Sequence, residues 1–233
     1  MTPYRIASRF ITATRWFFPK KWRLPLRYHA LVRSPGAEPE MKRLFDLCPR
    51  FRCAVDVGTN HGFYAYKMAQ RFEHVFAFEA NRVEEFDLLH YPKPNVHLFQ
   101  YGLSSTNETH TLRVPMQRGV AIAGWASVEN RDLPFADGFL EMPVELQRLD
   151  DQPFVQNHAL DLIKIDVEGH ELEVLKGGRE TIRRDKPVLI VENNEDQQRE
   201  ILEFLGNLGY RATTYARLFN SQAPSPNLIF LPE

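Results

Sequence analysis

The sequence predicts an α/β fold in which a mostly parallel sheet carries helices on both faces. Short apolar runs alternate with stretches whose apolar residues recur at helical spacing, which is typical of βαβ units. The apolar run at 53–57 leads directly into a glycine turn and a helical stretch. With 233 residues and 43% apolar content, the chain is long enough to bury one sizeable core.

The expected elements follow one another from about residue 37 to the C-terminus. We predict strands at 53–57, 74–78, 96–100, 160–165, 188–192, 210–215 and 227–231, and helices at 40–47, 62–71, 83–90, 171–176 and 195–208. The segment 103–150 fits a helix poorly, so we expect extended segments at 109–114 and 142–149 around a glycine-containing loop. This order predicts a Rossmann-like domain over 37–233 with an insertion at 103–150.

Residues 1–36 form a separate basic and aromatic extension. The first 33 residues carry eight Lys or Arg and no acid, interleaved with aromatic residues such as Trp16 and Trp22. We expect Pro19 and Pro25 to break any long helix there. This composition is typical of interfacial segments, so we expect peripheral contact with an anionic membrane through residues 1–33. The alternative is that these aromatic side chains pack on the domain or on a second subunit.

The remaining composition narrows the class of protein. Because the whole chain carries a net charge of −1, the eight cations of residues 1–33 leave −9 for the rest, which argues against nucleic acid as a partner. Two cysteines, Cys48 and Cys53, suit a reducing compartment. No apolar run is long enough for a membrane span and no secretory signal is recognisable. We therefore expect a cytoplasmic protein, either free or held at the inner face of a membrane, and nothing in the sequence specifies an oligomeric state.

A glycine turn follows the first predicted strand of the domain. The spacing from Gly58 to Gly62 is G-x-x-x-G, so the dinucleotide pattern G-x-G-x-x-G is absent. With Asp56 at the strand end and Asn60 in the turn, the loop suits a cationic amino-acid ligand. Glu79 ends the next strand, where a carboxylate can accept hydrogen bonds from a ribose diol.

A second polar segment follows the strand at 160–165. It places Asp166 at the carboxyl edge of the sheet, and Glu168 and His170 come directly after it. Acids at the start of the next helix also favour its dipole, and we give Glu171 and Glu173 that role alone.

Taken together, these segments resemble the FkbM family of methyltransferases over about residues 50–231. The resemblance is carried by 55–64, 77–80, 149–151, 161–171 with 175–178, and 227–230. Ala80 departs from the family, which more often has proline there. The resemblance implies a class I methyltransferase fold, S-adenosyl-L-methionine as cofactor, and O-methylation of a hydroxyl on a saccharide, a glycan or a polyketide-type natural product.

The expected site divides into three sets of residues. We expect the cofactor to be bound by Asp56, Gly58, Asn60, Gly62, Glu79 and Gly102. The catalytic candidates, in order, are Asp166, Glu168 and His170, as a base for the acceptor hydroxyl or a group that holds it. Trp125 and Glu192 are the expected acceptor-binding residues. We expect the acceptor to be a saccharide, free or lipid-linked, that is held partly by the 103–150 insertion.

Three other hypotheses remain open at the level of sequence. A divalent metal could assist, because Asp166, Glu168, His170 and Glu192 offer oxygen and nitrogen ligands, but no spacing is diagnostic and we assign no metal site. An NAD-dependent oxidoreductase is disfavoured by the missing glycine pattern. A non-catalytic protein that binds S-adenosylmethionine or a glycan could share the fold.

Overall fold

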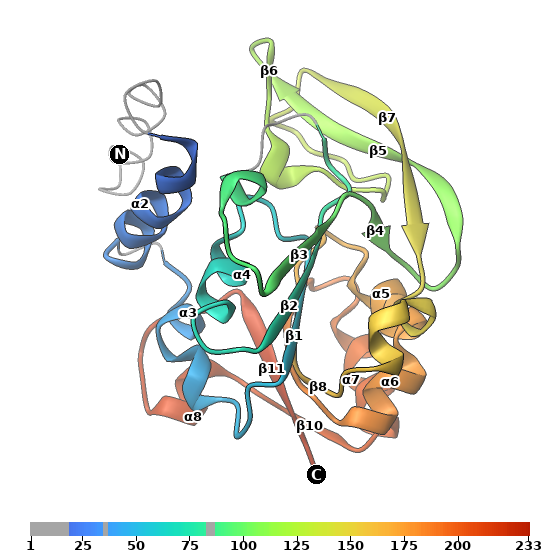
Figure 1. Cartoon of the computed structure of the whole chain (residues 1–233). Coiled ribbons are helices and arrows are strands. Elements are labelled where there is room, and N and C mark those ends of the chain that lie inside the picture. The colour runs from blue at the N-terminus through green and yellow to red at the C-terminus, as the bar shows by residue number, and fades with distance from the viewer. Residues whose placement is uncertain (1–18, 35–36, 83–86) are drawn as a thin grey trace.

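The computed structural model describes residues 19–34, 37–82 and 87–233, which form a central seven-stranded sheet, a smaller sheet and short helices (Figure 1). The central sheet has the order β10-β11-β9-β8-β1-β2-β3, and β11 runs antiparallel to both of its neighbours. Its strands are β1 (Cys53–Val57), β2 (His74–Phe78), β3 (Val96–Phe99), β8 (Leu160–Ile165), β9 (Val188–Glu192), β10 (Tyr210–Thr213) and β11 (Asn227–Pro232). The predicted mostly parallel α/β sheet is confirmed.

Helices cover both faces of this sheet because its buried strands alternate their side chains between two apolar cores. Val55 and Val57 belong to the core under α5, α6 and α7, whereas Ala54 belongs to the core under α2, α3, α4 and α8. The helices are α2 (Lys20–Val32), α3 (Pro39–Arg43), α4 (Phe63–Met68), α5 (Glu171–Gly177), α6 (Arg179–Asp185), α7 (Gln198–Asn207) and α8 (Tyr215–Phe219). Short 3₁₀ turns connect them at Leu44–Asp46, Asp87–His90 (η2), Ala123–Trp125 (η3), Leu149–Asp151 and Pro153–Gln156.

The 103–150 insertion forms the second sheet, with the order β4-β7-β5-β6. Its strands are β4 (Gly102–Leu103), β5 (Glu108–Gln117), β6 (Val120–Ala121) and β7 (Gly138–Gln147). The expected extended segments are therefore present, and β5 and β7 pair antiparallel over most of their length. In Figure 1 this sheet lies beyond the β3 edge, over the end of the central sheet where the functional site lies.

The N-terminal helix α2 contradicts the expectation that Pro25 breaks a helix there. Pro25 lies inside α2, which continues because Leu24, Tyr28 and Leu31 are buried in the core that α2 shares with α4. Packing of that face outweighs the hydrogen bond that proline removes. Trp22, by contrast, is exposed, and residues 1–18, which include Trp16, lie outside the described residues.

Other boundaries differ from the prediction. Residues 87–90 form a 3₁₀ turn, and 83–86, the start of the helix expected there, lie outside the described residues. Tyr215 begins α8, because Thr214 caps that helix by accepting a hydrogen bond from the Arg217 amide. Both cysteines are free and buried. None of the helices in the described part of the chain has the length and apolar character needed to span a bilayer.

Candidate functional site

A cavity of about 300 Å³ lies where β1, β2, β8 and β9 end, between the central sheet and the second sheet. Carboxyl ends of parallel strands are where open α/β folds bind ligands. The central sheet contributes Gly58, Glu79, Asp166 and Glu192, and the insertion contributes residues from 102 to 128 and Leu146. Segments far apart in the sequence thus form one cavity.

The turn after β1 requires glycine for two reasons at Gly58. Its φ is +76°, and a Cβ built there would lie 1.8 Å from the carbonyl oxygen of Asp166. The amides of Gly58 and Thr59 both donate to the carbonyl of Phe78. The turn therefore packs directly against the end of β8 and is held at the end of β2.

A smaller cavity of about 160 Å³ lies on the other side of this turn. It shares Glu38, Gly58, Asn60 and Asp166 with the larger cavity, and Leu31 of α2 and Met41 of α3 also line it. The N-terminal helices therefore help to enclose the site.

Asp56 lines the smaller cavity, but its carboxylate already accepts hydrogen bonds from the protein. Its Oδ2 accepts hydrogen bonds from Thr59 Oγ1 at 2.6 Å and from the Ala65 amide at 2.9 Å. Burial raises the pKa of this carboxyl to about 6, although the bond from Thr59 opposes the shift. In this structure Asp56 fixes the turn to α4. Its predicted contact with the cofactor stays a prediction.

Gly62 lies behind the turn, at the start of α4. Its φ is +86°, and a Cβ there would approach Leu88 Cβ to 2.8 Å. Gly102 does line the larger cavity, yet a Cβ on it would meet Leu146 at 2.7 Å. Both glycines are thus explained by packing, and a direct role in cofactor binding remains a prediction for each.

Glu79 is buried at the edge of the larger cavity. Its Oε2 accepts a hydrogen bond from the Asn60 amide and its Oε1 from the Asn81 amide, both at 2.8 Å. Burial raises the pKa of Glu79 to about 7, and the two backbone bonds oppose that shift. Each oxygen keeps capacity for a further donor, as a ribose diol would supply.

Three carboxylates converge on the opposite side of the larger cavity. Oxygen atoms of Asp166, Glu168 and Glu192 lie within 4.8 Å of one another. Lys164 Nζ lies 3.0 Å from Asp166 Oδ2, and Arg131 Nη1 lies 2.5 Å from Glu168 Oε2. Two of the three carboxylates therefore have a dedicated cation, and Glu192 has none among the described residues.

Lys164 is a site residue that the sequence analysis did not single out. Its side chain is 1% exposed, and Nζ also donates to Asn227 Oδ1 at 3.0 Å. Burial alone would lower the pKa of this ammonium, but the carboxylates of Asp166 and Glu38 raise it above its usual value. A lysine between Ile163 and Ile165 in a mostly apolar strand was the signal that could have found it.

Glu38 was also missed, because it precedes a short helix outside the recognised motifs. Its Oε2 accepts hydrogen bonds from Tyr64 and from Asn227 Nδ2, both at 2.7 Å. Glu38 lines both cavities, so it adds a carboxylate at the junction between them.

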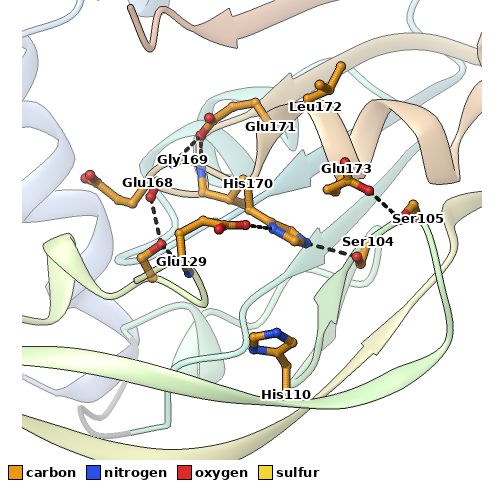
Figure 2. Close-up of polar contacts among 12 residues, drawn as sticks. Ser104, Ser105, His110, Glu129, Glu168, Gly169, His170, Glu171, Leu172 and Glu173 are labelled. Carbon is orange, nitrogen blue, oxygen red and sulfur yellow. Dashed lines mark hydrogen bonds and ion pairs between the residues drawn. The ribbon is translucent and has the colours of Figure 1, made fainter. Parts of the chain in front are cut away.

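His170 lies at the wall of the larger cavity with both ring nitrogens engaged (Figure 2). Nδ1 lies 2.6 Å from Glu129 Oε1 and Nε2 lies 2.9 Å from Ser104 Oγ. These contacts join the start of α5 to two segments of the insertion. His170 is thus placed at the site as predicted, but a solvent-facing lone pair for base catalysis is not evident. Its catalytic role remains a prediction.

The loop 127–131 holds the turn that carries Glu168. The Glu168 carbonyl accepts hydrogen bonds from Ser127 Oγ at 2.8 Å and Arg131 Nη1 at 3.0 Å. Glu168 itself has φ of +57°, which these contacts help to stabilise. Burial raises the pKa of its carboxyl, and Arg131 opposes that effect.

Trp125 lies at the rim of the cavity in η3. Its neighbours Ala123, Gly124 and Ala126 line the cavity, whereas its own ring packs edge-on against Phe135 at 5.1 Å and is 43% exposed. An acceptor that extends beyond the cavity could reach this ring.

The three converging carboxylates have the oxygen donors that hard divalent ions prefer. Lys164 and Arg131 already compensate Asp166 and Glu168, so the group is a poorer divalent site than its spacing indicates. We assign no metal to it.

Comparisons with known proteins give one family match and several solved structures that are similar to this chain. Residues 56–212 match the model of the methyltransferase FkbM domain. The FkbM methyltransferase from Methylobacillus flagellatus is 16% identical, with a TM-score of 0.48, over 90% of this chain and 53% of that one. This chain therefore spans about half the length of that protein. No curated protein gives a significant sequence match.

Two further solved structures have similar folds. Precorrin-6y C5,15-methyltransferase from Geobacter metallireducens is 14% identical, with a TM-score of 0.45, over 84% of this chain and 87% of that one. A putative methyltransferase from Streptococcus mutans, solved in complex with SAH, is 11% identical, with a TM-score of 0.43, over 82% and 94%. The family match covers more than half of the sequence, and the chain belongs to the FkbM family of methyltransferases.

Proposed function

We propose that this protein is an S-adenosylmethionine-dependent O-methyltransferase that acts on a hydroxyl of a saccharide or glycan. The observation that carries the proposal is a single cavity with the buried carboxylate of Glu79 on one side and the carboxylates of Asp166, Glu168 and Glu192 on the other. Family membership supports the transfer of a methyl group.

The residues of the cavity fit this cofactor. Glu79 has acceptor capacity for a ribose diol, and Gly58 and Asn60 of the turn line the same cavity. The excess of carboxylates suits a ligand with a positive charge on sulfur and on its amino group. Asn60 and Asp166 line both cavities, so one extended ligand can contact both.

When bound, the cofactor would supply an electrophilic methyl group on a sulfonium. The protein must hold the acceptor hydroxyl in line with that methyl group and remove the hydroxyl proton. Asp166 pairs with Lys164, lines the cavity and has a side chain that is 32% exposed, so it can accept a hydrogen bond from the hydroxyl. We assign Asp166 to orienting the acceptor.

The acceptor class rests on the insertion and on the family resemblance. The β4–β7 sheet covers the cavity, and the exposed face of Trp125 at its rim can stack on a sugar ring. A polyketide-type hydroxyl is the second candidate, because the resemblance includes such acceptors.

Calorimetric titration with S-adenosylmethionine and S-adenosylhomocysteine tests the cofactor. Glu79→Ala is expected to weaken both affinities by about 5- to 150-fold, since a buried polar contact contributes about 1–3 kcal/mol. Glu73→Ala, at an exposed acid just before β2, is the matched control and is expected to bind like the parent. If the parent binds neither ligand, the proposal fails.

A methyl-transfer screen tests the acceptor, with glycans, polyketide-type alcohols, proteins and nucleic acids as candidates. We expect product with glycans, and we expect Asp166→Asn to lower turnover at least about tenfold with cofactor affinity nearly unchanged. Transfer confined to proteins or nucleic acids would overturn the acceptor class. Cofactor binding without transfer to any acceptor would favour a non-catalytic binding protein.

A further inference from the structure

Glu192 is the one carboxylate of the converging three that lacks a cation in the described part of the chain. Asp166 has Lys164 at 3.0 Å and Glu168 has Arg131 at 2.5 Å, whereas no described side chain donates a hydrogen bond to the carboxylate of Glu192. Two fixed cations against three carboxylates leave one negative charge uncompensated. A cavity wall of this kind must take up either a proton or a positively charged ligand.

We infer that Glu192 is the general base of methyl transfer, and that it holds a proton until a sulfonium ligand enters the cavity and displaces it. The inference rests on the proposed function and names the base of that same site. Asp166 then holds the acceptor hydroxyl, and Glu192, which no cation in the described residues compensates, removes its proton.

The surroundings of Glu192 favour a protonated state in the empty cavity. Burial, and then the charges of Asp166 and Glu168, raise the pKa of Glu192 to about 8, and Lys164 opposes them. Five segments contribute charged and titratable groups around Glu192. β8 and its end contribute Lys164 and Asp166, and the following turn contributes Glu168 and His170. The other groups are Glu171 of α5, Arg131 of the loop 127–131, and Glu38 of the segment before α3. Acids outnumber cations in this set, so a proton on Glu192 relieves repulsion.

A sulfonium beside the cluster reverses that balance. An opposite charge within about 4–6 Å lowers the pKa of a carboxyl by about 1–3 units. Glu192 would then be ionised at neutral pH when the methyl donor is present. With the thioether product, which is uncharged at sulfur, Glu192 would stay protonated.

Methyl transfer balances when Glu192 is ionised beside the sulfonium and protonated beside the thioether. The acceptor oxygen forms a bond to the methyl carbon while the carbon–sulfur bond breaks, and the bonding pair remains on sulfur as a thioether. The acceptor proton passes to the Glu192 carboxylate. The next molecule of donor releases that proton to solvent, so each turnover yields one methyl ether, one thioether and one proton.

Proton release on binding measures this coupling without an acceptor. Titrations at pH 7.0 in buffers of different ionisation enthalpy, with S-adenosylmethionine and with S-adenosylhomocysteine, report the protons released by each ligand. We expect the sulfonium ligand to release close to one proton more than the thioether. Other carboxyls with a raised pKa, such as Glu79, contact parts that the two ligands share, so their contribution cancels in the difference.

The matched variants are Glu192→Gln and Glu195→Gln. Glu195 is an exposed acid three residues beyond Glu192, outside the cavity lining. Glu192→Gln is expected to lose the difference in proton release and to bind the thioether like the parent, whereas Glu195→Gln should keep the difference. In the parent, affinity for the sulfonium ligand should rise relative to that for the thioether by up to about tenfold per pH unit between pH 6.5 and 8.

The outcomes separate this inference from the proposed function. Equal proton release with both ligands, or an unchanged difference in Glu192→Gln, overturns the role of Glu192 and leaves cofactor binding intact. Failure of the parent to bind either ligand overturns both.

Discussion

Lys164 Nζ lies 3.0 Å from Asp166 Oδ2 and 3.0 Å from Asn227 Oδ1, so one buried ammonium joins the end of β8 to the start of β11. The antiparallel pairing of β11 with β9 makes this possible, because it places Asn227 opposite Glu192 at the carboxyl edge of the sheet. A lysine buried in this way serves the site and the fold together.

Replacement of Lys164 by methionine keeps most of its volume and removes its charge. We expect Lys164→Met to lower the free energy of unfolding at pH 8 by about 1–3 kcal/mol, because the cluster then has two uncompensated carboxylates. Chemical denaturation measures the change. Lys176→Met, which removes an exposed lysine paired with Glu173, should cost less than about 1 kcal/mol. Equal effects of the two variants would contradict a special role for Lys164.

Alanine substitutions at Gly58 and Gly119 distinguish the cost of backbone strain from the cost of a close packing contact. Both have positive φ, +76° and +73°, but a Cβ on Gly58 would collide with the Asp166 carbonyl, whereas nothing lies within 4 Å of one on Gly119. Gly119→Ala should therefore cost about 1–2 kcal/mol of stability from strain alone. Gly58→Ala should cost several kcal/mol more and abolish cofactor binding. Thermal unfolding and calorimetry of both variants check this, and a similar loss in each would rule out the close approach.

The stability of the ligand-free protein should depend on pH through its buried acids. Glu79 and Glu192 have a pKa raised to about 7 and about 8, so the folded state binds more protons than the unfolded chain above pH 6.5. The free energy of unfolding should therefore decrease as pH rises from about 6.5 to 8.5, by at most about 1.4 kcal/mol per pH unit for each group.

Below pH 6.5 His61 opposes this decrease in the free energy of unfolding. Burial lowers its pKa to about 3, with a contribution from Arg27, so the unfolded chain binds the extra proton there. Because the raised pKa values of Glu79, Glu192 and Asp56 outweigh this single histidine, denaturation across pH 5.5–8.5 should show a free energy of unfolding that decreases throughout, and Glu192→Gln should flatten the decrease above pH 6.5. If the slope above pH 6.5 is unchanged in that variant, Glu192 is not the group with the raised pKa.

We also propose that α2 contributes to peripheral membrane contact. Trp22 of α2 is 56% exposed, Lys20 and Lys21 are exposed, and α2 packs against η2, where Leu89 is 48% exposed. Aromatic and basic side chains together favour an anionic interface, and each basic residue contributes about 1 kcal/mol. The opposite face of α2 is buried, so only this exposed face is available.

Co-sedimentation with phosphatidylserine-containing vesicles at low salt tests this surface. Joint replacement of Lys20 and Lys21 by Glu should reduce partition at least about tenfold, and Val120→Ala, at an exposed apolar residue on β6, should leave it unchanged. Equal partition of the parent onto neutral and anionic vesicles would show that α2 serves packing alone.

The insertion and the N-terminal helix are two regions whose tertiary contacts could not be predicted from the sequence. Extended segments at 109–114 and 142–149 follow from local pattern. Their pairing, and the reach of Ser127, Glu129 and Arg131 to the turn at 168–170, depend on contacts between residues that are roughly 20 to 40 positions apart. Local propensity carries no information about such distant partners. Similarly, the helix through Pro25 is stabilised by tertiary burial that its own sequence does not report.

The sequence by itself determined the parallel α/β sheet, the glycine turn, and the placement of Glu79, Asp166 and Glu192 at strand ends, because strand periodicity and turn chemistry are local properties. Only the tertiary structure decided which acid has a cation. Lys164 and Arg131 reach Asp166 and Glu168 through folding, and no cation in the described part of the chain pairs with Glu192. The reason is that charge compensation depends on distances between segments, which no spacing along the chain specifies.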